Sequence, residues 1–87
     1  MKYKFIKIDK ENEAILISAD GVQLWIDYFI GIEEGEKFYT WEFNQYIFFD
    51  YSIQDQKIKK TQEKILKDAE NFDCFLDEIF AEKNLIK

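Results

Sequence analysis

The chain of 87 residues contains no histidine, no arginine and no proline, and its only cysteine is Cys74. Without histidine it lacks the side chain that most often acts as a base or binds a metal near neutral pH, and a nucleophilic triad has no base. A single cysteine forms no internal disulfide, and a lone thiolate does not make a zinc site. We therefore expect no enzyme activity, no cofactor and no bound metal.

The few glycines and the cysteine suggest no other chemistry. Gly21, Gly31 and Gly35 are too far apart to form a phosphate-binding loop. Cys74 stands between Asp73 and Phe75, with no cationic neighbour that would favour the thiolate. The sequence predicts a packed thiol at this position rather than a nucleophile.

All twelve basic residues are lysines, and the formal net charge is −6. A negative, arginine-free chain is poorly suited to nucleic acid, where phosphate neutralisation and arginine contacts to bases dominate binding. It is equally unsuited to anionic lipid. The N-terminus does not resemble a signal peptide, and no apolar run approaches the length of a membrane span. Together with the free thiol, this predicts a cytoplasmic protein of a bacterium or a host cell.

The C-terminal part has the periodicity of a helix with one apolar side. An apolar residue recurs every seven positions, and further apolar residues flank this row: Ile58, Ile65, Phe72, Ile79 and Ile86, with Leu66, Ala69, Phe75, Leu76 and Phe80. We expect one helix from about residue 54 to 83, or two helices that meet near Asn71. The acids Asp73, Asp77 and Glu78 favour the break, because they would then open a second helix instead of ending the first.

The N-terminal part alternates aromatic or β-branched residues with polar ones, which indicates strands. Strands are expected at residues 2–8, 14–18, 37–43 and 46–51, and the last of these is either a separate strand or the continuation of the previous one past a bulge. Polar or glycine-containing turns separate them at residues 9–13, 19–21 and 33–36. Residues 2–8 read as an edge strand protected by lysines, and residues 14–18 as a central one.

Residues 22–30 fit two structures. A helix would begin at the cap Asp20, gain a capping box from Gln23 and stop at Gly31. A strand would place Val22, Leu24, Ile26, Tyr28 and Ile30 on one face. The aromatic and β-branched content, and the hairpin signal that follows, favour the strand.

These patterns predict a single α+β domain over residues 1–87. Residues 1–51 are mainly a small antiparallel sheet of four to five strands, and residues 52–84 are a C-terminal helix or kinked helix pair packed against it. The chain has 16 aromatic residues, 2 Trp, 5 Tyr and 9 Phe. That is more apolar surface than so small a core hides, so the surplus would face a partner or a second copy, unless the tyrosines simply lie at the rim.

Acids are concentrated in the middle of the chain. Residues 11–55 carry ten acids, with Lys37 as the one cation, and tryptophans and tyrosines are interleaved with them. Such rings often anchor interfaces, and an acidic surface attracts a basic one. This predicts a partner-binding site, with a solvated acidic face as the alternative; its residues are Asp27, Glu33, Glu34, Glu36, Tyr39, Trp41 and Glu42.

In size, charge and aromatic content, though in no motif, the chain is similar to the compact acidic inhibitors of phages and mobile elements, such as anti-CRISPR, anti-restriction and DNA-mimic proteins. It is similar in the same way to toxin-neutralising immunity proteins. The resemblance implies a small acidic protein that binds another protein with a basic surface and blocks its working surface. The alternative is a structural or accessory subunit that forms a homodimer through an aromatic sheet face.

Overall fold

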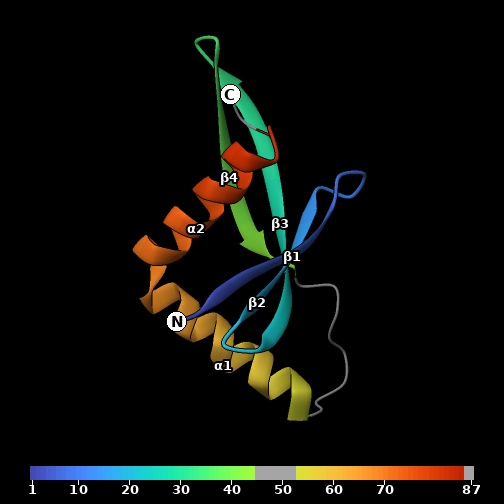
Figure 1. Ribbon diagram of the computed structural model, residues 1–87, viewed down its shortest axis with the longest axis vertical. Helices are drawn as coiled ribbons and strands as arrows, with labels where there is room; N and C mark the ends of the chain where they lie inside the picture. Colours follow the sequence, from blue (N-terminus) through green and yellow to red (C-terminus); the bar gives the residue numbers. More distant parts are fainter. Residues whose placement is uncertain (45–52, 86–87) are drawn as a thin grey trace.

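A computed structural model describes residues 1–44 and 53–85, and it has the predicted α+β arrangement (Figure 1). Four strands form an antiparallel sheet in the order β1-β2-β3-β4, so that each strand pairs with its neighbour in the chain. Two helices follow. The elements are β1 (Tyr3–Asp9), β2 (Ala14–Ala19), β3 (Val22–Glu33), β4 (Glu36–Phe43), α1 (Ile53–Lys67) and α2 (Ala69–Glu82). The strand expected at residues 46–51 lies outside the described residues.

Two tight turns connect the last three strands. Asp20 and Gly21 have φ angles of 49° and 84°, and Glu34 and Gly35 have φ angles of 52° and 81°. Two consecutive positive φ angles are typical of the type I′ turn that joins twisted antiparallel strands. Asp20 is therefore a turn residue rather than a helix cap, and residues 22–30 form the strand that was favoured.

β3 is longer than expected because it continues through Gly31. Gly31 lies opposite Phe38 of β4, and the Phe38 ring occupies the space that a side chain on Gly31 would need. An aromatic ring over a cross-strand glycine is a known way of stabilising a strand at such a position. The glycine makes room for this ring instead of ending the element.

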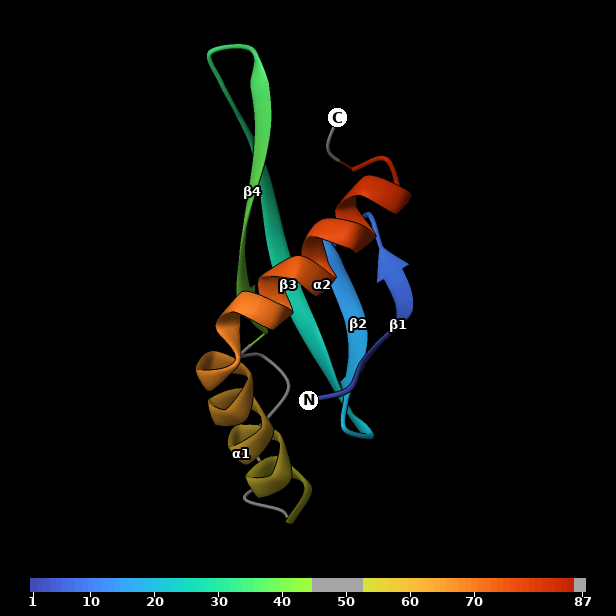
Figure 2. The ribbon, with the colours of Figure 1, turned by 60° about the vertical axis from the view of Figure 1, so that its left-hand side comes forward.

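The sheet has two different faces, which we name the helix face and the open face. The register puts the following residues of β2, β3 and β4 on the helix face: Ile15, Ile17, Ala19, Val22, Leu24, Ile26, Tyr28, Ile30, Tyr39, Trp41 and Phe43. The open face carries Leu16, Trp25, Asp27, Phe29, Phe38, Thr40 and Glu42. Figure 2 shows α2 crossing the helix face, and α1, which contacts β3, precedes it at the lower end of the sheet. The alternation predicted for residues 22–30 and 37–43 is confirmed.

The helical segment bends at Asp68, three residues before the predicted break at Asn71. The amide of Asp68 still donates to the carbonyls of Lys64 and Ile65, at 3.1 and 3.0 Å, and its own carbonyl accepts from the amide of Phe72 at 3.0 Å. Its ψ of 29° nevertheless departs from helical values and turns the chain. Asn71 instead lies within the first turn of α2.

The charges on either side of Asp68 agree with a bend at this residue. Lys64 and Lys67 occupy the last turn of α1, and Glu70 occupies the first turn of α2. Each sign then lies at the helix end that its macrodipole favours. A break at residue 71 would have left Glu70 at a helix C-terminus, where the macrodipole disfavours an acid. The observed bend avoids this unfavourable placement.

α2 ends in a Schellman motif. Asn84 has a φ of 57°, its amide donates to the carbonyl of Ala81 at 3.2 Å, and the amide of Leu85 donates to that of Phe80 at 3.0 Å. Leu85 also packs against the core, as the residue after such a turn commonly does.

The predicted apolar row is confirmed at Ile58, Ile65, Phe72 and Ile79, which are buried; Ile86 lies outside the described residues. Leu76 and Phe80 are buried beside them. Three predictions were wrong: the side chain of Leu66 is 59% exposed, and Ala69 and Cys74 are exposed. Leu66 follows the buried Ile65 by 100° around the helix and Cys74 follows Phe72 by 200°, so both point away from the sheet.

Replacing Phe72, whose side chain is fully buried, tests whether α2 is part of the core. We expect Phe72→Ala to lower the free energy of unfolding by about 3–5 kcal/mol, because it leaves a cavity between α2 and the sheet. The matched control is Leu66→Ala, which we expect to change it by less than about 0.5 kcal/mol. Urea denaturation followed by circular dichroism measures both. Equal losses in the two variants would contradict this packing.

Candidate interaction surface

The helix face and α2 are joined by aromatic rings. Phe72 packs edge-on against Trp41 and Tyr3, with ring centroids 4.9 and 5.1 Å apart. Phe80 stacks on Tyr39 at 3.9 Å and meets Tyr28 edge-on at 5.2 Å. Tyr39 and Trp41, two of the predicted partner-binding residues, therefore lie half-buried between sheet and helix.

The polar ends of three of these rings donate hydrogen bonds to carboxylates of the helical segment. Tyr3 Oη donates to Asp68 Oδ2 at 2.8 Å, and Trp41 Nε1 donates to Asp73 Oδ1 at 3.2 Å. Tyr39 Oη donates to Asp77 Oδ1. Burial and then the hydrogen bond to Asp77 raise the pKa of Tyr39 above its ordinary value. Asp68, Asp73 and Asp77 thus help to attach the helical segment to the sheet.

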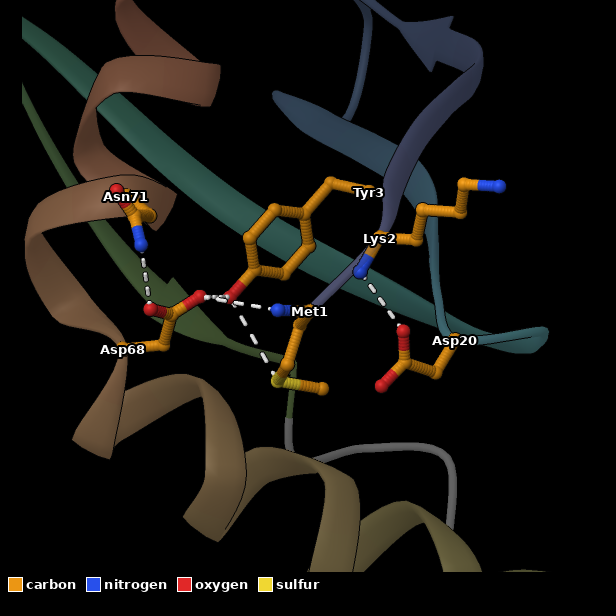
Figure 3. Close-up of polar contacts among 6 residues, drawn as sticks. All are labelled: Met1, Lys2, Tyr3, Asp20, Asp68 and Asn71. Atoms are coloured by element: carbon orange, nitrogen blue, oxygen red, sulfur yellow. Dashed lines mark hydrogen bonds and ion pairs between the residues drawn. The ribbon is translucent and has the colours of Figure 1, made fainter.

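Asp68 joins the N-terminus to the bend between the helices (Figure 3). Besides Tyr3, it accepts a hydrogen bond from Asn71 Nδ2 at 2.7 Å, and the amino group of Met1 lies 3.7 Å from Oδ2. The hydrogen bond from Tyr3, followed by that from Asn71, holds the pKa of Asp68 below its ordinary value. Close by, the amide of Lys2 donates to Asp20 Oδ1 at 2.7 Å.

The second feature of the surface is a projecting hairpin. The pairing of β2 with β3 ends at Asp27, and from there β3 and β4 continue as a two-stranded ribbon (Figures 1 and 2). We call residues 27–42 the hairpin arm. All seven predicted partner-binding residues lie on the arm, whose one cationic residue is Lys37.

The seven residues are nevertheless divided among three surfaces. Tyr39 and Trp41 face α2. Asp27 and Glu42 lie directly opposite each other on the open face, where Asp27 Oδ1 accepts a hydrogen bond from Asn44 Nδ2 at 3.0 Å. The acidic tip consists of Glu33, Glu34 and Glu36, at and beside the turn, with Glu33 directly opposite Glu36.

Sequence reasoning missed several residues of this region. Phe29, Ile32 and Phe38 are large apolar side chains of the arm that are 61, 69 and 40% exposed. Their signal was present, since the alternation already placed Phe29 and Phe38 opposite the core-facing residues. Asp73 and Asp77 gave no such signal, because their proximity to β4 depends on how α2 crosses the sheet.

Two shallow hollows lie along the arm. One, which we call the β4 groove, is lined by Lys37, Phe38, Tyr39, Thr40, Trp41, Asp73 and Asp77. The other lies at the tip and is lined by Glu33, Glu34, Glu36, Lys37 and Phe38. Both combine carboxylates with aromatic surface, which suits a ligand that is itself basic and partly apolar.

Within residues 1–44 and 53–85, no group of three or more His, Cys, Asp or Glu side chains is placed to hold a metal ion. Neither helix of this described part is long and apolar enough to cross a membrane. Comparisons with protein-family models, with curated proteins and with solved structures give no match to this chain.

The contact between Tyr3 and Asp68 makes stability depend on pH. Because the pKa of folded Asp68 lies below its ordinary 3.8, the contact stabilises the fold above that pH, and the stabilisation disappears as the pH falls through the lower folded-state value. We expect Asp68→Asn to be less stable than the unmodified protein at about pH 7, and the difference to shrink towards about pH 2.

The variant Tyr3→Phe keeps the ring and removes the hydroxyl donor. Like Asp68→Asn, it should lose less stability than the unmodified protein when the pH is lowered. Urea denaturation at a series of pH values measures all three proteins. The same pH dependence in the unmodified protein and in both variants would show that the contact does not stabilise the fold.

Proposed function

We propose that this protein binds another protein through the hairpin arm and blocks the surface that it covers. The partner surface is basic, and the function is binding without catalysis. The observation that carries the proposal is the pairing of acids on the arm.

Two acid pairs lie directly across the β3–β4 ladder, Asp27 opposite Glu42 and Glu33 opposite Glu36. Like charges in such positions destabilise a hairpin. Glu34 adds a fifth negative charge, and Lys37 alone opposes them. A basic partner surface would replace this repulsion by attraction, and it would also increase the rate of association.

The apolar side chains of the arm support the same proposal. Phe29, Ile32 and Phe38 are exposed next to the acidic tip. Interfaces typically have aromatic and aliphatic residues at their centre and charged residues around it. The arm supplies both parts on one projecting element, and this shape suits insertion into a cleft of the partner.

A more specific form of the proposal is an inhibitor of the phage or mobile-element type, such as an anti-CRISPR, anti-restriction or DNA-mimic protein that acts in the cytoplasm. In that case the carboxylates of the arm would take the place of phosphates in a basic channel. The support is the acidic arm together with the small size of the domain, and the partner is a nucleic-acid-binding protein.

The second candidate is a subunit that self-associates through an aromatic sheet face. Tyr39 and Trp41 are already packed against α2, so the most exposed aromatic side chains that the described residues offer a second copy are Phe29 and Phe38 on the open face. Such a dimer would depend little on salt, and its melting temperature would rise with protein concentration.

Charge reversal at the tip tests the proposed function. The variant Glu33→Lys/Glu34→Lys/Glu36→Lys should lose partners captured by the unmodified protein from a lysate of the source cells at low salt. The matched control reverses three exposed acids of the helices, Glu63→Lys/Glu70→Lys/Glu78→Lys. This control variant should still capture the same partners. Elution of the unmodified complex by a salt gradient provides a second measure.

Both variants change the net charge equally, so a general charge effect would weaken both. If capture by the tip variant is unchanged at low salt, the acidic tip is not part of the binding surface. If instead no partner is captured and sedimentation shows a dimer, the self-associating subunit is the better description.

A further inference from the structure

The outer edge of β4 differs from the other edge of the sheet. β1 is interrupted by an irregularity between Phe5 and Lys7, and its exposed Lys4 and Lys7 discourage pairing with another strand. β4 has an unbroken register over eight residues and contains no proline. Within residues 1–44 and 53–85, no strand pairs with its outer edge.

The turn at Glu34 and Gly35 fixes which backbone groups of β4 point outward. In a two-residue hairpin the closing pair, here Glu33 and Glu36, exchanges hydrogen bonds, and bonded pairs then alternate along the ladder. The amide of Asn44 donates to the carbonyl of Trp25 at 3.1 Å, as this alternation of bonded pairs along β3 and β4 requires. The outward-pointing amides and carbonyls therefore belong to Lys37, Tyr39, Trp41 and Phe43.

The β4 groove runs beside these groups. On its helix side it is bounded by the exposed carboxylates of Asp73 and Asp77, which are held by Trp41 Nε1 and Tyr39 Oη. A strand added to β4 would project alternate side chains towards these two carboxylates. Lysine or arginine at those positions would complement them.

We propose that the outer edge of β4 binds an extended segment of a partner protein as an added strand, with basic side chains at alternate positions facing Asp73 and Asp77. Strand addition of this kind derives affinity from main-chain hydrogen bonds and specificity from alternate side chains. The inference rests on the proposed function, since it names the part of the partner that is bound.

A second copy of the chain fits this edge poorly. Antiparallel pairing of two β4 strands would place both α2 helices on the same face of the joined sheet. The second copy would thus bring its own Asp73 and Asp77 towards the same two carboxylates of the first copy. Glu36 and Glu42 of its β4 would approach as well. Like charges would accumulate along the contact, whereas a basic segment neutralises them.

The probe is the peptide acetyl-Thr-Lys-Val-Lys-Val-Lys-Thr-amide, and its comparison peptide has glutamate in place of each lysine. Amide hydrogen exchange is measured on the intact protein with each peptide. We expect the lysine peptide to slow exchange at Lys37, Tyr39 and Trp41, whose amides point outward. Phe38 and Thr40, whose amides already bond to β3, serve as internal controls and should not change.

Two pairs of variants separate the contributions of backbone and charge. Lys37→Pro removes one outward amide and no bond to β3, so it should bind the lysine peptide more weakly than Lys37→Ala, which keeps that amide. Asp73→Asn/Asp77→Asn keeps acceptors for Trp41 and Tyr39, yet it should weaken binding by about tenfold. Glu70→Gln/Glu78→Gln, on the same helix, should not.

The proposal is wrong if the lysine peptide fails to bind, if the glutamate peptide binds equally well, or if exchange at the outward amides stays fast in the complex. It is also wrong if sedimentation shows a dimer in which those amides are already protected without peptide. The acidic-tip variant distinguishes this failure from that of the proposed function: if the tip reversal abolishes partner capture but Lys37→Pro matches Lys37→Ala, the arm binds without strand addition.

Discussion

The packing of Phe72 and Phe80 against rings of β1, β3 and β4 joins the helices to the sheet, and most other features depend on this contact. A chain of this length with a single cysteine and hence no internal disulfide needs an efficient core, because small domains bury a limited share of their surface. The two phenylalanines meet four aromatic rings of the sheet, and three of those rings also reach a carboxylate. The same side chains thus provide apolar packing through their rings and hydrogen bonds through their polar groups. These combined contacts fix how α2 crosses the strands.

Much of the fold followed from local pattern. The strand alternation, the two glycine turns and the seven-residue spacing each have a direct backbone cause, so the strands at residues 22–30 and 37–43 and the buried Ile65 and Phe72 were predictable. The position of the helix bend was not, because Asp68 is selected by its contacts with Tyr3 and Met1, residues more than sixty positions away. The exposure of Cys74, by contrast, follows from its position 200° around the helix from the buried Phe72.

The candidate site was predicted in part. The acids and rings singled out in the sequence do lie on one hairpin, because residues 27–42 form a continuous ribbon. Their distribution over two faces and a tip requires the strand register, and the approach of Asp73 and Asp77 to β4 requires the tertiary structure. Composition therefore pointed to the segment, and the strand alternation to Phe29 and Phe38, whereas the grooves could be found only in the folded protein.

The two tryptophans lie on opposite faces of the sheet. Trp41 is packed against Phe72 under α2, and Trp25 lies on the open face, where Lys7 Nζ is 5.6 Å from the centre of its ring. The protein therefore contains two optical reporters in different environments. Emission from Trp41 is sensitive to how α2 packs on the sheet, and emission from Trp25 to changes on the open face. A variant that keeps only one of the two tryptophans would allow changes on each face of the sheet to be followed separately by fluorescence.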